Sequence, residues 1–92
     1  MKIIWSDTAI DTYLHILDHI YNKWTIIEVE NFAESVDHLL SQLIINKELC
    51  PPSVLLGYRK CVVSKQTSLI YTINDETIFL ITFIDNRALC DY

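Results

Sequence analysis

The tetrapeptide Thr25-Ile26-Ile27-Glu28 places strong limits on the fold of this chain. It has the form of a capping box, in which the threonine and glutamate side chains each bind the other residue's backbone N–H at the start of a helix. On both sides of the box, apolar residues recur every three or four positions, which predicts two amphipathic helices. Only two or three residues separate the two segments, so we expect an antiparallel helical hairpin.

The first helix is predicted over about Asp7–Asn22, and the second from the capping box to about Asn46. Ser6 supplies an N-cap hydroxyl, and Pro51-Pro52 prevents the second helix from continuing. The apolar positions of the first helix are Ile10, Tyr13, Leu14, Leu17, Ile20, Tyr21 and Trp24. Those of the second are Val29, Phe32, Ala33, Val36, Leu39, Leu40, Leu43 and Ile44.

Strand-like segments flank this hairpin in the sequence. The first is Lys2–Trp5, and three more follow the prolines, at Tyr58–Val63, Leu69–Ile73 and Ile78–Ile84. The last strand is apolar on both faces, so we expect it inside the sheet. The predicted fold is α+β in the order β-α-α-β-β-β, with the helical hairpin packed on a mainly antiparallel sheet.

Length and charge exclude several classes of protein. The 92 residues make one domain, 1–92, because so short a chain cannot bury two independent cores. Seven Lys and Arg against twelve Asp and Glu give a net charge of −5, which argues against direct binding to duplex DNA. No apolar run approaches the roughly 18 residues that a membrane span requires. With no signal peptide visible, we expect a cytoplasmic protein that does not engage membranes.

The cysteines and histidines do not predict a metal site. Cys50, Cys61 and Cys90 are three in number and lack the close doublets of a zinc site, so we expect reduced thiols, with Cys61 a small strand residue. His15 and His19 have the spacing of a metal-binding pair, but no third ligand lies within sequence reach. We interpret both histidines as solvent-facing helix residues and expect neither a metal nor a cofactor.

Five segments carry a recognisable pattern in order along nearly the whole chain: Ile4–Ala9, Ile20–Trp24, Arg59–Lys65, Ser68–Tyr71 and Phe83–Arg87. In their order and spacing they resemble the RelE/ParE superfamily of toxins from type II toxin–antitoxin systems. The resemblance implies a compact toxin that is neutralised by a small cognate antitoxin encoded beside it. It also implies one of two activities. RelE-like members cut messenger RNA on the ribosome, whereas ParE-like members inhibit DNA gyrase without cutting anything.

RNA cleavage needs a base, an acid and positive charge around one phosphate. If the chain were a RelE-like, metal-independent endoribonuclease, its catalytic residues would be Arg59, Lys60, Tyr71 and Arg87. A plain meander with Val63 opposite Ser68 places Lys60 opposite Tyr71 on one face and Arg59 on the other.

Each candidate also has a structural interpretation. Lys60 can cover the ring of Tyr71, and Arg59 can pair with Asp75 or Glu76. Arg87 is expected at the opposite end of the sheet, with Lys65, where it can cap a helix or the tail. The segment Ala88–Tyr92 departs from the family pattern, although Tyr92 could replace an aromatic residue found near the end of some RelE-like toxins.

The excess of acidic residues and the wide separation of the lysines and arginines favour the ParE-like function, inhibition of DNA gyrase by binding. The alternatives are a ribosome-dependent mRNA endoribonuclease and a non-toxic relative that acts as a binding module. A negative toxin should attract an antitoxin segment that is basic or mainly apolar. We expect that segment to lie along the sheet or across the helical hairpin, over exposed members of the apolar stripes.

Overall fold

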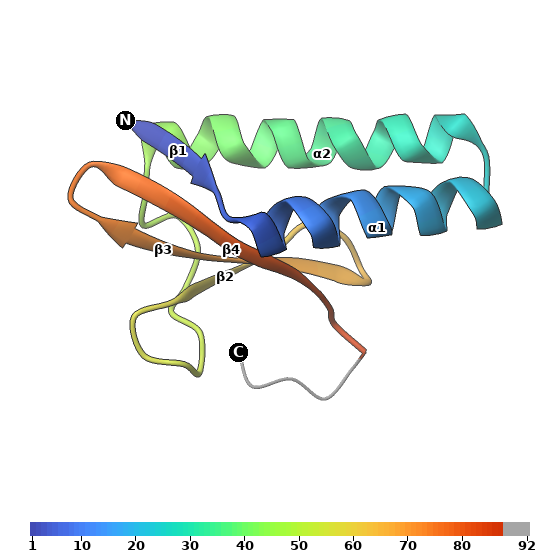
Figure 1. The fold of residues 1–92 in the computed structure, drawn as a ribbon. Helices are drawn as coiled ribbons and strands as arrows, with labels where there is room; N and C mark the ends of the chain where they lie inside the picture. The colour runs from blue at the N-terminus through green and yellow to red at the C-terminus, as the bar shows by residue number, and fades with distance from the viewer. Residues whose placement is uncertain (88–92) are drawn as a thin grey trace.

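The computed structural model describes residues 1–87 and contains two helices and four strands in those residues (Figure 1). Their order confirms the predicted β-α-α-β-β-β arrangement, and each boundary lies within two residues of its expected position. The elements are β1 (Lys2–Trp5), α1 (Asp7–Lys23), α2 (Ile26–Ile45), β2 (Arg59–Val62), β3 (Thr67–Asn74) and β4 (Thr77–Asp85).

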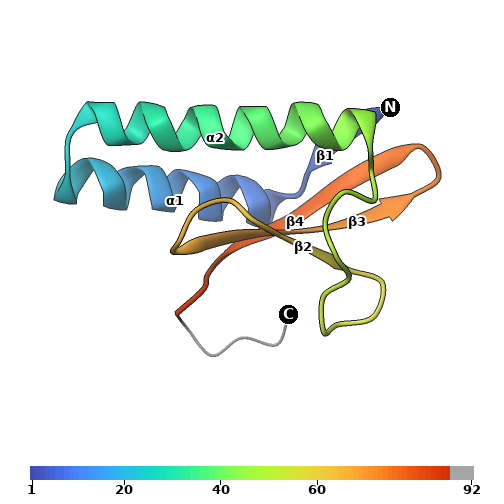
Figure 2. The same ribbon diagram turned by 180° about the vertical axis from the view of Figure 1, so that it is seen from behind.

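The four strands form one sheet in the order β1-β4-β3-β2. β1 runs parallel to β4, and the other two pairings are antiparallel. β4 therefore lies inside the sheet, as its two apolar faces predicted. Both helices lie on one side of the sheet (Figures 1 and 2), so the molecule has two layers.

The two helices begin where the sequence predicted. The Ser6 hydroxyl accepts a hydrogen bond from the Ala9 backbone N–H at 2.9 Å. The Glu28 carboxylate accepts one from the Thr25 backbone N–H at 3.0 Å and another from the Thr25 hydroxyl, which confirms the capping box. The bonds from the Ala9 and Thr25 N–H groups satisfy backbone donors that the start of a helix leaves without partners.

The core lies between the helical layer and the sheet. Its buried side chains include Ala9, Phe32, Val36, Leu43, Leu69, Tyr71, Ile78, Leu80 and Phe83. Trp5 and Tyr13 pack around Phe83, with ring centroids 5.8 Å and 5.4 Å from it. This aromatic cluster joins β1, α1 and β4, and so holds the first helix against the sheet.

Hydrogen bonds with Ser6, the N-cap of α1, and with Thr12 of α1 satisfy backbone groups in the part of β4 that extends beyond β1. A bulge shifts the β3–β4 register, so that Ile70 faces Thr82 while Tyr71 faces Leu80, and Ile81 becomes the extra residue. The Ser6 hydroxyl donates to the Ile81 carbonyl at 2.7 Å, and the Phe83 N–H donates to the Thr12 hydroxyl at 3.1 Å. Two helix side chains thus replace ladder partners that β1 is too short to supply.

Only part of each predicted apolar stripe is buried. Tyr13, Leu17 and Ile20 pack against the core, as expected, and Ile16 joins them. An outer stripe along α1 and the start of α2 remains exposed, made up of Ile10, Leu14, Tyr21, Trp24, Ile26 and Ile27. The apolar arc of α1 is wider than the surface that the sheet and α2 together cover, so the remainder faces solvent. Within residues 1–87, neither helix is apolar enough over a sufficient length to cross a membrane.

Candidate functional site

The β2–β3 register differs from the predicted one by one residue. Arg59 faces Tyr71 and Lys60 faces Ile70, so the predicted pairing of Lys60 with Tyr71 is wrong. The cause is the turn, in which the Val63 N–H donates to the Thr67 carbonyl at 2.9 Å. This contact leaves three residues in the turn instead of four, and a one-residue change moves every side chain of the strand to the other face. Arg59 therefore shares the core-facing side of the sheet with Tyr71, and Lys60 lies on the opposite side.

Arg59 binds the connection between α2 and β2. Its Nη1 donates to the Cys50 carbonyl at 2.6 Å, and its Nη2 lies 4.0 Å from the Glu48 carboxylate. The expected ion pair with Asp75 or Glu76 is wrong, because the connection returns over the core-facing side of β2, where Arg59 points. Glu76 instead lies 3.6 Å from the Lys47 ammonium. The guanidinium of Arg59 thus anchors a backbone segment.

Tyr71 is fully buried, with 0% of its surface exposed. Its hydroxyl donates to the Lys47 carbonyl at 2.8 Å. Burial raises the pKa of the Tyr71 phenol above its usual value, because the ionised form would lose its hydration. The phenol is therefore a neutral, internal donor that an external substrate does not reach.

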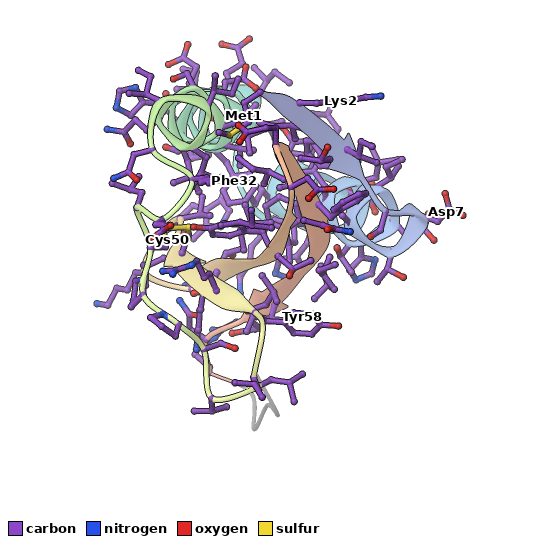
Figure 3. All side chains as sticks on the ribbon, turned by 90° about the vertical axis from the view of Figure 1, so that its left-hand side faces the viewer. Met1, Lys2, Asp7, Phe32, Cys50 and Tyr58 are labelled. Carbon is purple, nitrogen blue, oxygen red and sulfur yellow. A yellow bond between two sulfur atoms is a disulfide. The ribbon has the colours of Figure 1, made fainter. Side chains whose placement is uncertain are left out.

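A disulfide joins Cys50 to Cys61, so the prediction of reduced thiols is wrong for this pair (Figure 3). Cys61 points into the core opposite Leu69, and the returning connection brings Cys50 beside it, with a Cα–Cα distance of 5.3 Å. The two residues are 11 apart in sequence, a spacing that by itself indicates no pairing. Cys90 lies outside the described residues.

The opposite end of the sheet carries an exposed ion pair. The Arg87 guanidinium lies 2.9 Å from Asp85, which also accepts the Arg87 backbone N–H at 2.8 Å. These hydrogen bonds lower the pKa of the Asp85 carboxyl to about 2 and raise the pKa of Arg87. The Asn86 N–H donates to the Gln66 carbonyl at 2.8 Å, which places this end of β4 beside the β2–β3 turn, as predicted for Arg87 and Lys65.

A groove of about 670 Å³ separates this end of the sheet from α1. Its apolar lining comes from Ile16, Ile20, Phe32, Phe83 and Ile84. Its polar lining comes from Asp11, Thr12, His15, His19, Ser64, Gln66, Thr67, Asp85 and Arg87. Sequence reasoning missed the groove, because its walls come from four separate segments: α1, Phe32 of α2, the β2–β3 turn and the end of β4. The sequence signal nearest to it is the helical spacing of His15 and His19 on α1.

The groove does not provide a set of metal ligands. His15 and His19 are exposed, as expected from their helical positions. Across residues 1–87, no three His, Cys, Asp or Glu side chains are grouped so that they could hold a metal ion. The arrangement of apolar lining and polar rim suits an organic ligand better than a small inorganic one.

The four candidate catalytic residues do not meet at one place. Arg59 and Tyr71 lie together at one end of the sheet, on its core-facing side. Lys60 lies on the other face, and Arg87 follows the opposite end of β4. The proposed role of Tyr92, with the rest of Ala88–Tyr92, falls outside the described residues.

Comparisons with known proteins agree with this architecture. The family model described as the ParE toxin of the type II toxin–antitoxin system parDE matches residues 3–88. A chain from the chromosomal ParDE system of P. aeruginosa superposes with a TM-score of 0.78 at 16% identity, covering 92% of this chain and 95% of that one. A comparison with curated protein sequences finds no significant match.

Two structures from Staphylococcus aureus have the same fold. The YoeB dimer has a TM-score of 0.65 at 19% identity, covering 89% of this chain and 92% of that one. The YoeB–YefM complex has the same score and identity, covering 91% and 94%. The family match extends over almost the entire chain, which belongs to the ParE toxin family of type II toxin–antitoxin systems. The predicted membership of the RelE/ParE superfamily is confirmed.

Proposed function

We propose that this toxin arrests growth by binding DNA gyrase in the cytoplasm, without chemistry of its own, and that a cognate antitoxin neutralises it. The observation that carries this proposal is the match to the ParE toxin family over residues 3–88, combined with the separation of the residues that RNA cleavage would need.

The separation of the candidate residues argues against a ribonuclease. Cleavage needs a base, an acid and positive charge around one phosphate. Tyr71 is buried and donates to a backbone carbonyl, and Arg59 donates to another. Arg87 binds the carboxylate of Asp85, which offsets its positive charge. Along residues 1–87, no cluster of free cations and acid–base groups therefore remains among the four candidates.

The exposed outer stripe favours an antitoxin that binds the helical hairpin. Asp7, Asp11 and Asp18 lie along the same side of α1 as Ile10 and Leu14, because helical spacing places them within about a third of a turn of the stripe. A basic amphipathic segment would cover the apolar residues and meet these carboxylates. The net charge of −5 draws such a segment toward the toxin.

The target is tested with the purified chain and two assays in parallel. We expect the chain to inhibit supercoiling by purified DNA gyrase and to leave messenger RNA intact in a translating extract. Cleaved message with undisturbed supercoiling would establish the ribosome-dependent endoribonuclease instead. Absence of both effects, with normal growth on induction, would indicate a non-toxic binding module.

The antitoxin surface is tested with the protein encoded by the neighbouring gene. Leu14→Asp places a charge in the middle of the outer stripe, and we expect it to weaken antitoxin binding roughly thirtyfold, the size of one interface hot spot. Ile45→Asp is the matched control, because Ile45 is 86% exposed on α2 and outside the stripe. Equal affinities for the two variants would show that the antitoxin binds elsewhere.

A further inference from the structure

The loop that connects α2 to β2 exposes aliphatic side chains at its tip. Leu56 is 99% exposed and Val54 83% exposed, with Leu55 between them. No charged residue occurs from Leu49 to Tyr58. The loop extends away from the sheet on the side opposite to both helices (Figures 1 and 2). These apolar side chains are thus presented to solvent, far from the outer stripe on the helical hairpin.

Hydrogen bonds hold the backbone of this loop. The Ser53 N–H donates to the Tyr58 carbonyl at 2.8 Å, and the Tyr58 N–H donates to the Leu55 carbonyl at 3.2 Å. The Ser53 hydroxyl also donates to the Leu55 carbonyl and accepts a hydrogen bond from the Leu55 N–H. From β3, the Thr72 hydroxyl donates to the Gly57 carbonyl at 2.7 Å. The tip therefore has a defined conformation although Val54 and Leu56 bury little surface.

The base of the loop is closed as well. Cys50 and Cys61 are joined covalently, and the Lys60 N–H donates to the Pro51 carbonyl at 3.1 Å. Pro51 and Pro52 remove further backbone freedom. Ordering a loop normally costs conformational entropy, and a loop that is already ordered avoids this cost when it binds. A preorganised tip with fully exposed aliphatic side chains suits insertion into a partner.

We propose that the Val54–Leu56 tip is the element by which this toxin docks on its protein target, with Leu56 entering an uncharged apolar pocket of DNA gyrase. This inference rests on the proposed function and names the surface by which the toxin binds gyrase. The tip and the outer stripe lie on opposite sides of the sheet, so the target and the antitoxin would use separate surfaces.

The charge distribution of the chain favours a protein pocket over other occupants. Binding to an anionic membrane surface needs a cluster of basic residues beside a short apolar anchor. Arg59 and Lys60 follow the loop directly, but Arg59 already binds Cys50 and Glu48, and the net charge of −5 opposes such binding. The same charge makes a second copy of the chain repulsive at long range. An uncharged apolar pocket has no such penalty, because the ten residues from Leu49 to Tyr58 carry no charge to desolvate.

The test compares Leu56→Asp with Ile45→Asp in the full-length protein. Both changes replace an exposed aliphatic residue by aspartate, so both variants should fold, and circular dichroism melting checks this. We measure the toxin concentration that halves supercoiling by the gyrase holoenzyme. Leu56→Asp should raise this concentration roughly thirtyfold, the effect of losing one interface hot spot, while Ile45→Asp should change it less than twofold.

Each outcome has a distinct meaning. If the wild type fails to inhibit gyrase, the proposed function fails, whatever the variants do. If the wild type inhibits and Leu56→Asp inhibits equally well, the docking inference alone is overturned. Wild-type binding to phosphatidylcholine vesicles that Leu56→Asp abolishes would also overturn it, in favour of a membrane contact. A dimer that Leu56→Asp converts to a monomer would overturn it in favour of self-association.

Discussion

Arg59 and Arg87 are located at opposite ends of the same sheet, and their surroundings differ. Arg59 donates to the Cys50 carbonyl beside a disulfide and beside the buried hydroxyl of Tyr71. Arg87 binds Asp85 at the surface, next to a groove of about 670 Å³. At the Arg59 end, the polar groups hold segments of the chain together. At the Arg87 end, the polar groups remain accessible to solvent.

This difference shows that residue type alone does not identify a functional cation. Both arginines match segments typical of the toxin superfamily, yet only Arg87 can meet a partner without disturbing the fold. Surface ion pairs contribute little to stability, whereas a charged donor that satisfies a partly buried carbonyl contributes more. Substitutions at the two ends should therefore have unequal effects, and the following measurements test that inequality.

The largest effect is expected from removal of the disulfide. The double variant Cys50→Ala/Cys61→Ala should lower the free energy of unfolding by about 2–3 kcal/mol, because the open loop gains conformational freedom in the unfolded chain. Urea denaturation measures the change. Dithiothreitol should lower the stability of the wild type by a similar amount and leave the double variant unaltered. No difference between oxidised wild type and variant would contradict a structural role for this bond.

Substitution of the two arginines compares the ends directly. Arg59→Met should lower the free energy of unfolding by about 1.5–2 kcal/mol, because the Cys50 carbonyl loses a charged donor. Arg87→Met should produce a much smaller loss, since its ion pair is exposed. Both are measured by urea denaturation under one set of conditions. Equal losses would remove the distinction between the two ends.

The Tyr71 hydroxyl should have a smaller effect. Tyr71→Phe keeps the ring but leaves the Lys47 carbonyl without its donor, and we expect a loss of about 1 kcal/mol in the free energy of unfolding. Tyr21→Phe is the matched control, because Tyr21 is exposed on α1 and the same change there should lie within about 0.5 kcal/mol of zero. If Tyr71→Phe left the free energy of unfolding unchanged, water would satisfy the Lys47 carbonyl equally well.

The smallest effect is expected in the dependence of stability on acidic pH. The pKa of Asp85 is about 2 in the folded chain, below its ordinary value of 3.8, because Arg87 donates hydrogen bonds to the ionised form. Its contribution to stability is therefore present above pH 4 and is lost as the pH falls toward 2. Asp85→Asn should lose less stability than the wild type between pH 5 and pH 2 in urea titrations. Asp18→Asn, on the exposed face of α1, controls for the general loss of a negative charge.

The helices and strands could be predicted because their signals are local. The capping box at Thr25–Glu28, the hydroxyl of Ser6 and the Pro51-Pro52 pair each act within a few residues, and the structure confirms the elements that they delimit. The interior position of β4 followed from its two apolar faces. Such features depend on backbone hydrogen bonds and side-chain periodicity, both of which can be read directly along the chain.

The site was less predictable, because one residue in a turn decided it. The turn after Val63 contains three residues where four were expected, and this moved Lys60 away from Tyr71 and brought Arg59 to it. Strand register has a period of two, so an error of one residue inverts every facial assignment. The sequence between Val63 and Thr67 carries no strong preference for either turn length.

The sequence by itself determined the order of the elements and the amphipathic hairpin, since short-range periodicity and capping specify both, and the resemblance of its segments to known toxins indicated the family. The tertiary structure alone decided the partners of Arg59, the disulfide between Cys50 and Cys61, the groove beside Arg87 and the exposed tip at Leu56. The partners of Arg59, the disulfide and the tip depend on where the connection between α2 and β2 returns over the sheet, and the groove depends on how α1 lies beside the end of β4. Both are set by packing between segments far apart in the chain, which no local pattern encodes.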